Sequence, residues 1–131
     1  MSLHDEHVDI FIYCQEPTPQ LAVCRDAFRR LTPGPHTLHV ICEPGTMQQN
    51  WMRGFKLCKN RFVVSAHDDV EVLEPNWRES LLDAFEADQK LGLCGPVQID
   101  SDESLAVFRQ DPESFRASRS EERRVGKECR L

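Results

Sequence analysis

The chain has 131 residues, an apolar fraction of 40% and a formal net charge of −6 at pH 7. This length suits one domain with a modest core, and an acidic chain lacks the basic face that binding to nucleic-acid phosphates requires. No apolar stretch approaches the length of a membrane span, and the first seven residues are polar and acidic, unlike a signal peptide. We therefore expect a cytoplasmic protein without a nucleic-acid partner.

Strand-like and helix-like segments alternate from the N-terminus. The apolar run Val8–Cys14 is rich in β-branched and aromatic residues and predicts a strand. Leu21, Cys24 and Phe28 then recur at helical spacing. A second strand is expected over Thr37–Cys42.

The same alternation continues into the second half of the chain. Thr46 and Gln49 have the spacing of a capping box and predict the start of a helix. The apolar run Phe62–Val64 predicts a third strand, in which Phe62 and Val64 should be largely buried. Pro75 fits the first turn of the next helix, where Trp77, Leu81 and Phe85 form an apolar stripe that should largely bury Trp77 and Phe85. A fourth strand is expected at about 93–99. Strands that alternate with helices of this length predict an α/β fold with a mostly parallel sheet.

Polar composition and cysteine spacing set further expectations. From Asp100 onward few residues are apolar, so the pattern predicts little ordered structure there. The six cysteines include no Cys-x-x-Cys pair, and we expect free thiols within the core. His36 and His39 would point to opposite faces of a strand, which argues against a zinc site.

Two adjacent carboxylates, Asp68 and Asp69, follow the third predicted strand almost directly. Ligands of open α/β sheets bind outside the carboxyl ends of the strands, and a cation that neutralises a diphosphate is held by carboxylate oxygens. An Asp pair can also simply form a turn. Because parallel strands end at one edge, Glu43 is expected at the same edge as this pair.

Residues 50–96 resemble the nucleotide-sugar half of the family-2 glycosyltransferases, which have the GT-A fold. Asn50–Phe55 is similar to the family's Asn-x-x-Gly helix segment, Phe62–Val64 to its third strand, and His67–Val70 to its metal-binding DXD signature. His67 replaces the first carboxylate of that signature. Cys42–Thr46 matches the family's Asp-x-Gly-Ser segment only loosely.

The resemblance implies a three-layer α/β/α, Rossmann-like GT-A sheet that binds a nucleotide-diphospho-sugar, with a UDP-sugar as the first choice. It implies Mn²⁺ or Mg²⁺ bound by Asp69. His67 is either a second metal ligand or a residue that faces the other side of the sheet. The residues that the resemblance places at the donor are Gln15, Glu16, Glu43, Asn50, Arg53 and Asp68. It offers no catalytic base here, because the family's base follows the fourth strand.

The last residues carry a second resemblance. Arg119–Cys129 is similar to the translation of a common sequencing-library adaptor, although a charged solvated tail is the alternative interpretation. We therefore expect residues 119–131 to be an artefactual, disordered tail. Residues 1–118 would then be the truncated donor-binding half of a longer inverting glycosyltransferase, inactive by itself.

Two other functions compete with this interpretation. One is a non-catalytic α/β module for folding or interaction. The other is a nucleotidyltransferase of related fold, which would usually carry a glycine-rich loop with Arg or Lys after the first strand. Gln15–Pro17 at that position has neither feature.

Overall fold

The computed structural model describes residues 2–92 and 102–113. The chain divides into two compact units, residues 1–78 and residues 79–131. The strand expected at 93–99 and the tail 119–131 lie outside the described residues.

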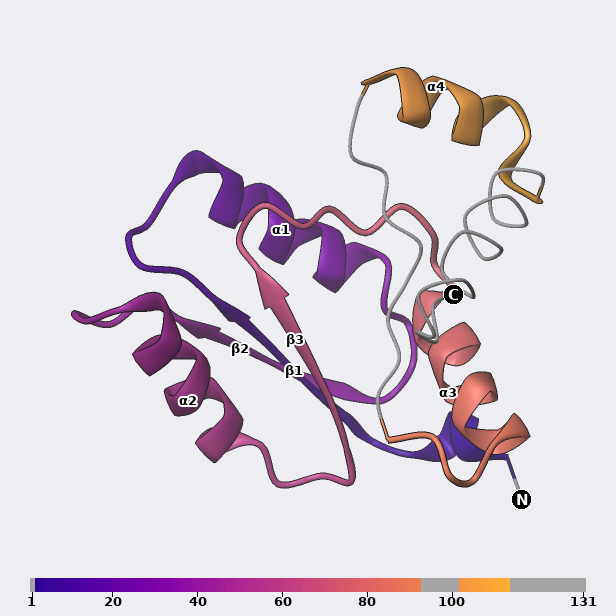
Figure 1. Ribbon diagram of the computed structural model, residues 1–131, viewed down its shortest axis with the longest axis horizontal. Helices are drawn as coiled ribbons and strands as arrows, with labels where there is room; N and C mark the ends of the chain where they lie inside the picture. The colour runs from indigo at the N-terminus through magenta and orange to yellow at the C-terminus, as the bar shows by residue number, and fades with distance from the viewer. Residues whose placement is uncertain (1, 93–101, 114–131) are drawn as a thin grey trace. The chain divides into compact units, whose positions relative to one another are not determined.

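The first unit is built on three parallel strands: β1 (Val8–Tyr13), β2 (His36–Ile41) and β3 (Phe62–His67). Figure 1 shows them pointing in one direction, in the order β2-β1-β3. The predicted α/β fold with a parallel sheet is therefore confirmed. Since the chain passes from β1 to β2 and then returns across β1 to β3, the strand order reverses at β1.

The core of this unit surrounds β1, whose residues from Val8 to Ile12 are all at most 3% exposed. A strand whose side chains are buried in this way along its length must be covered on both faces. On one face the Phe11 ring lies against Gly54 of the helix between β2 and β3. The edge strand β3 is less buried, so Phe62 and Val64, predicted to be buried, are half-buried.

Helix α1 (Pro19–Arg30) begins and packs as its sequence predicts. Thr18 caps it by accepting a hydrogen bond from a backbone N–H of the first turn, and proline at the first helical position needs no such partner. Cys24 and Phe28 of the predicted apolar stripe are buried. The Phe28 ring meets Trp77 edge-on at 5.4 Å between centroids.

Helix α2 (Met47–Leu57) starts with the predicted capping box, in which both the Thr46 and Gln49 side chains bond the backbone of the first turn. Trp51 lies between the core and the surface: its ring meets Phe11 edge-on and stacks on Phe55 at 5.3 Å. Phe55 itself is 50% exposed.

Within the described residues, α3 (Trp77–Ala87) and α4 (Asp102–Gln110) follow. In α3 Leu82 is buried, whereas Trp77 and Phe85, predicted to be buried, are half-buried. The expectation of little order after Asp100 was wrong for residues 102–110, where apolar residues recur often enough to give a short helix a half-buried side. Across the described parts of the chain, no helix combines the length and apolar character needed to cross a membrane.

A buried carboxylate fixes the amino end of the sheet. Asp9 is 3% exposed, and its Oδ2 accepts hydrogen bonds from the backbone N–H of Lys59 at 2.8 Å and of Asn60 at 2.7 Å. Burial alone would raise the pKa of Asp9, but these bonds, with smaller help from His39, hold the pKa below its ordinary value. Asp9 therefore ties the connection between α2 and β3 to the central strand.

Replacement of Gly54 by alanine should destabilise the fold, because the new methyl group would overlap the buried Phe11 ring. Alanine favours helix by up to about 1 kcal/mol, but overpacking a full core costs about 1–3 kcal/mol, so a net loss is expected. Urea unfolding measures it. Gly92→Ala is the matched control, since a Cβ there meets nothing within 4 Å; equal stability of both variants would contradict the packing.

Asp9→Asn should cost about 1–2 kcal/mol of unfolding free energy at neutral pH, since charge-assisted hydrogen bonds become neutral ones. The folded-state pKa is depressed, so the stabilisation by Asp9 is present above the ordinary pKa of 3.8 and is lost as pH falls through the lower folded-state value. The difference between wild type and variant should therefore shrink below pH 3.8.

Urea unfolding at several pH values measures this difference. His39 Nε2 lies 3.5 Å from Asp9 Oδ1, so the comparison is repeated with His39→Gln in both chains. A difference that is independent of pH in that background would show that the charge of Asp9 contributes nothing.

Candidate metal centre

The three strands end together, because Tyr13 at the end of β1 is paired with Ile41 of β2 and with His67 of β3. Residues that follow the strands therefore share one edge, and the prediction that Glu43 and Asp69 lie at the same edge is confirmed. This edge is also where the strand order reverses, which is the usual place for ligands in open parallel sheets.

Three potential metal ligands converge at the end of β3. His67 Nδ1 lies 3.0 Å from Asp68 Oδ1 and 3.2 Å from Asp69 Oδ1. The three groups have ligand atoms within 4.8 Å of one another. Two carboxylates and one imidazole suit a divalent cation such as Mn²⁺, which accepts both oxygen and nitrogen ligands.

The two carboxylates differ in how firmly they are held. The Asp68 side chain is 8% exposed, and its Oδ2 accepts a hydrogen bond of 2.8 Å from the Thr18 hydroxyl. Thr18 is also the N-cap of α1, so Asp68 lies close to a helix N-terminus, where negative charge is stabilised. The Asp69 side chain is 64% exposed. Asp68 is thus a fixed group and Asp69 an accessible one.

The contacts of His67 bear on both of the roles considered from the sequence. Its ring meets Tyr13 edge-on at 5.6 Å, on the sheet face opposite to Asp68, and its Nε2 lies 3.2 Å from Met47 Sδ. Its Nδ1 nevertheless reaches both carboxylates. Contacts at the far side of an imidazole orient the ring when it binds a metal, and Met47 and Tyr13 would do so for His67.

Asn50 joins the ends of β1 and β2 and is 0% exposed. Its Nδ2 donates to Cys14 O at 2.8 Å and to Glu43 O at 2.9 Å. Its Oδ1 accepts from Glu43 N at 3.3 Å and from Arg53 Nη1 at 2.8 Å. In a continued parallel ladder Glu43 N would bond Cys14 O directly. Here the Asn50 amide lies between them: it accepts from Glu43 N and donates to Cys14 O, and so bridges the two strands where their direct pairing ends.

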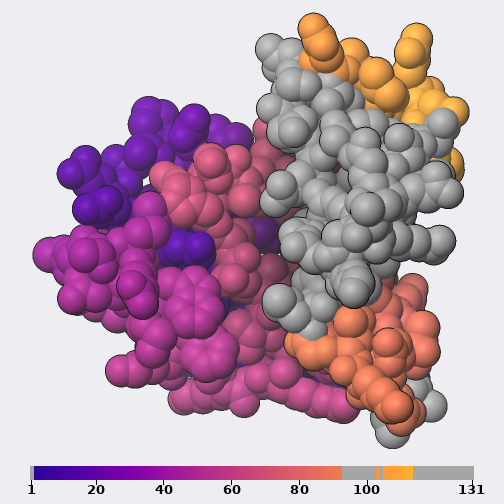
Figure 2. Space-filling model, in the orientation of Figure 1, coloured from indigo at the N-terminus to yellow at the C-terminus, as the bar shows by residue number. Residues whose placement is uncertain are grey.

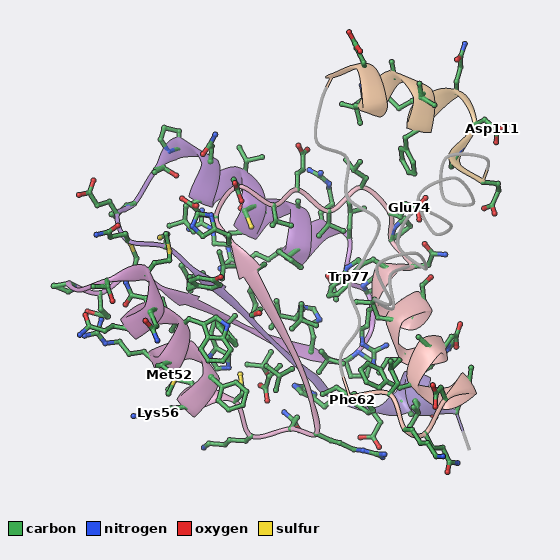
Figure 3. All side chains as sticks on the ribbon, viewed as in Figure 1. Met52, Lys56, Phe62, Glu74, Trp77 and Asp111 are labelled. Atoms are coloured by element: carbon green, nitrogen blue, oxygen red, sulfur yellow. The ribbon has the colours of Figure 1, made fainter. Side chains whose placement is uncertain are left out.

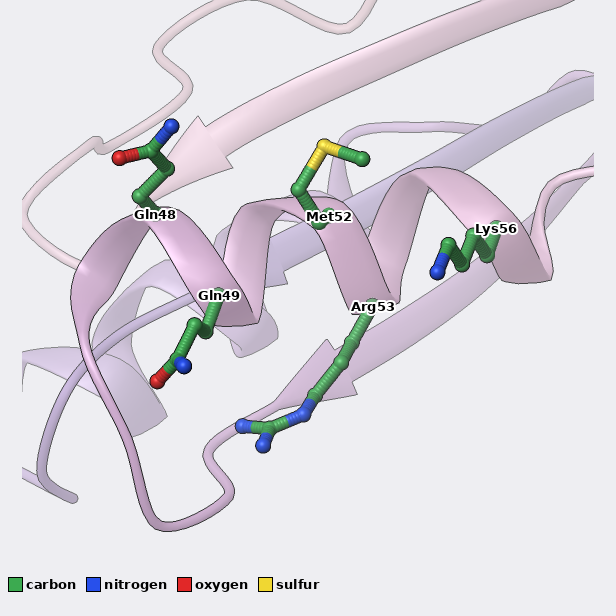
Figure 4. Close-up of a pocket in the computed structure, with 5 residues that line it drawn as sticks. All are labelled: Gln48, Gln49, Met52, Arg53 and Lys56. Atoms are coloured by element: carbon green, nitrogen blue, oxygen red, sulfur yellow. The ribbon is translucent and has the colours of Figure 1, made fainter.

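The other predicted donor residues are exposed around this edge. Glu43 follows β2, and Gln15 and Glu16 follow β1. Arg53 donates to Pro44 O at 2.9 Å, and Figure 4 shows it extending from α2 toward the loop after β2. The structure thus brings Glu43, Asn50 and Arg53 together and leaves Gln15 and Glu16 on the neighbouring loop.

A separate hollow lies along α2, on a surface visible in Figure 2. Met52 and Lys56 border it from the outer side of the helix (Figures 3 and 4). All of its lining residues belong to this one helix: Gln48, Gln49, Met52, Arg53 and Lys56. It includes none of the three potential metal ligands, so it is a groove between helical side chains and not the metal centre.

Free thiols lie near the carboxylates, and the expectation of core cysteines is confirmed for Cys14 and Cys24, whereas Cys42 and Cys58 are only half-buried and Cys94 and Cys129 lie outside the described residues. Cys14 and Cys24 are each 1% exposed. Burial raises the pKa of Cys14 to about 12 and that of Cys24 to about 11, and the nearby negative charge of Asp68 adds to both shifts. Both groups are therefore neutral thiols at pH 7.

Sequence reasoning missed the residues that support the centre: Thr18, Tyr13 and Met47. For Thr18 a signal existed, because Thr before Pro at the start of an apolar helix is an N-cap pattern. Its second bond, to Asp68 fifty residues away, depends on the tertiary fold. No local sequence pattern predicts the contacts that Tyr13 and Met47 make with His67.

Comparisons with protein-family models, with curated proteins and with solved structures find no match to this chain.

Asn50→Ala should destabilise the protein by about 2–4 kcal/mol, since each buried backbone group left without a partner costs about 1–3 kcal/mol. Urea unfolding measures the loss. Gln48→Ala, an exposed site on the same helix, should change stability by less than about 0.5 kcal/mol.

Asn50→Asp tests the donor group of the amide separately from its acceptor oxygen. It keeps the acceptor for Glu43 N and Arg53, but it sets an anionic oxygen against two carbonyl oxygens. Burial against those carbonyls favours the protonated acid, which can donate to one of them, so the penalty should shrink as pH falls. A penalty that grows at low pH, after correction for the wild type, would contradict the assigned bonds.

Proposed function

We propose that this chain binds a nucleotide-diphospho-sugar through a divalent cation, as the donor-binding part of a family-2-like inverting glycosyltransferase. The observation that carries the proposal is the convergence of His67, Asp68 and Asp69 at the carboxyl edge of a parallel sheet, at the point where the strand order reverses. The resemblance of residues 50–96 to that family supplies the choice of ligand.

The chemistry of donor cleavage explains why such a centre is useful. As the sugar leaves, negative charge grows on the diphosphate, and a cation that touches both phosphates stabilises this charge. Asp69 is the proposed metal ligand because it is exposed, with His67 Nδ1 as a second ligand. Asp68, which is held by Thr18 and lies 3.0 Å from His67 Nδ1, is proposed to contact the ribose or to share the metal region.

The nucleoside is proposed to lie toward β2. Glu43 has an exposed carboxylate that could accept an imide N–H of a uracil-type base, and Arg53 lies beside the same loop. Asn50 contributes indirectly, since its amide bonds are made within the chain and shape the ends of β1 and β2. Gln15 and Glu16 would border the donor from the loop after β1. The three-layer GT-A arrangement is part of this proposal.

The first measurement is calorimetry with UDP as the probe, in the presence of Mn²⁺ or Mg²⁺ and again with a chelator. Binding should require the metal. Asp69→Asn should weaken binding by more than about 1 kcal/mol, or about fivefold, which is the scale of losing a charge-assisted contact.

Glu71→Gln is the matched control, because Glu71 is an exposed acid two residues beyond the centre and should bind as the wild type does. Equal UDP affinity with metal and with chelator would contradict the proposal and favour a non-catalytic α/β module. Preference for a nucleoside triphosphate over UDP and UDP-sugars would favour a nucleotidyltransferase.

A further inference from the structure

Two thiols face each other across the last rung of the sheet. Cys14 N donates to Ile41 O at 3.1 Å, which in a parallel ladder pairs Cys14 with Cys42. Both follow a strand by one residue, so their side chains lie on the same face of the sheet. The Cys14 side chain interacts directly with that of Cys42.

The spacing of this pair suits a covalent bridge. Neighbouring strands lie about 4.8 Å apart, within the range of about 4.4–6.8 Å between the Cα atoms of disulfide-bonded cysteines. Asn50 Nδ2 donates to the carbonyl oxygens of both Cys14 and Glu43, and so holds the two strand ends at this spacing.

The two thiols differ in access. Cys14 is 1% exposed, whereas Cys42 is only half-buried. A small reagent therefore meets Cys42 before Cys14. The other free thiols in the described part of the chain are placed differently: Cys24 of α1 donates to His67 O, and Cys58, which follows α2, donates to Gly54 O.

We propose that Cys14 and Cys42 form a redox modification site that a low-molecular-weight disulfide such as oxidised glutathione converts into an intramolecular disulfide. The Cys42 thiolate attacks the glutathione disulfide, forms a mixed disulfide and releases one glutathione. The Cys14 sulfur then attacks the Cys42 sulfur and releases the second glutathione. Two protein thiols are oxidised to one disulfide, the glutathione disulfide is reduced to two thiols, and the two protons leave with the glutathione.

The site does not depend on the proposed function, since neither thiol is among the groups assigned to the metal or the donor. The bridge would lock the ends of β1 and β2 together beside Asp68, the neighbour of Cys14 in the adjoining strand. Its formation can therefore be followed with the chain alone, without metal or nucleotide.

The experiment treats the full reduced chain with oxidised glutathione, blocks the remaining thiols with N-ethylmaleimide, and identifies linked peptides by mass spectrometry. In wild type, the Cys14–Cys42 disulfide should be the main product. In Cys14→Ser, Cys42 should instead keep one glutathione as a stable mixed disulfide. In Cys42→Ser, a change at a half-exposed position, Cys14 should stay reduced.

Cys24→Ser is the matched control, because it removes the other buried thiol near this edge, and it should leave the bridge intact. Circular dichroism establishes that each variant is folded, and Cys14→Ala replaces Cys14→Ser if serine disturbs the core. A stable glutathione adduct on Cys42 in wild type, or a main disulfide between any other pair, would overturn the inference. Reaction of Cys14 in folded Cys42→Ser would also do so.

Discussion

The pairing of β1 on both sides is the constraint on which the rest of the first unit depends. A parallel strand with two parallel neighbours can be covered on both faces, so its side chains can be apolar on both, as those of Val8, Ile10, Phe11 and Ile12 are. The same pairing forces the carboxyl ends of all three strands to one edge. The core and the candidate metal centre therefore have one cause, since the register that buries β1 also aligns Tyr13, Ile41 and His67.

Buried polar groups define where this pairing stops. At the amino end Asp9 gathers the N–H groups of Lys59 and Asn60, which the connection into β3 would otherwise leave without partners. At the carboxyl end Asn50 fills the next rung between Cys14 and Glu43. An ionised carboxylate suits the position of Asp9 because only hydrogen-bond donors converge there. An amide suits the position of Asn50 because both donors and acceptors face it. Each residue type follows from the groups that it faces.

Local patterns predicted the elements because each has a local cause. The capping box at Thr46 and the apolar stripe of α1 depend on neighbours within four residues, and both are present. The shared edge of Glu43 and Asp69 was predictable from topology alone. The centre's supports were not, because Thr18 reaches Asp68 across fifty residues of chain. Arg78 is a similar case: it is 2% exposed and donates to the backbone carbonyls of His4 and Glu6, more than seventy residues earlier.

For α3 the helix was predicted correctly, but the side of the helix predicted to be buried was wrong. Trp77, Leu81 and Phe85 have the spacing of one stripe, and the helix itself was predicted from them. However, Trp77 is turned so that its indole N–H donates to the Thr32 hydroxyl at 3.1 Å, and Leu82 is the buried apolar residue. A tryptophan whose polar atom must find a partner can shift the buried face of a helix by one position. Periodicity alone does not contain that information.

The arrangement of His67, Asp68 and Asp69 is best explained by electrostatics. Two adjacent carboxylates at one strand end repel each other, and the repulsion is strongest where Asp68 is removed from water. Three features offset it: the Thr18 hydroxyl, the N-terminus of α1 and the imidazole of His67 placed between the carboxylates. A divalent cation bound by Asp69 would offset it far more strongly, because its charge is larger and it would contact that carboxylate directly. Because Asp68 is already held and Asp69 is not, such a cation would have to order only one carboxylate and turn one imidazole, and this lowers the entropic cost of binding.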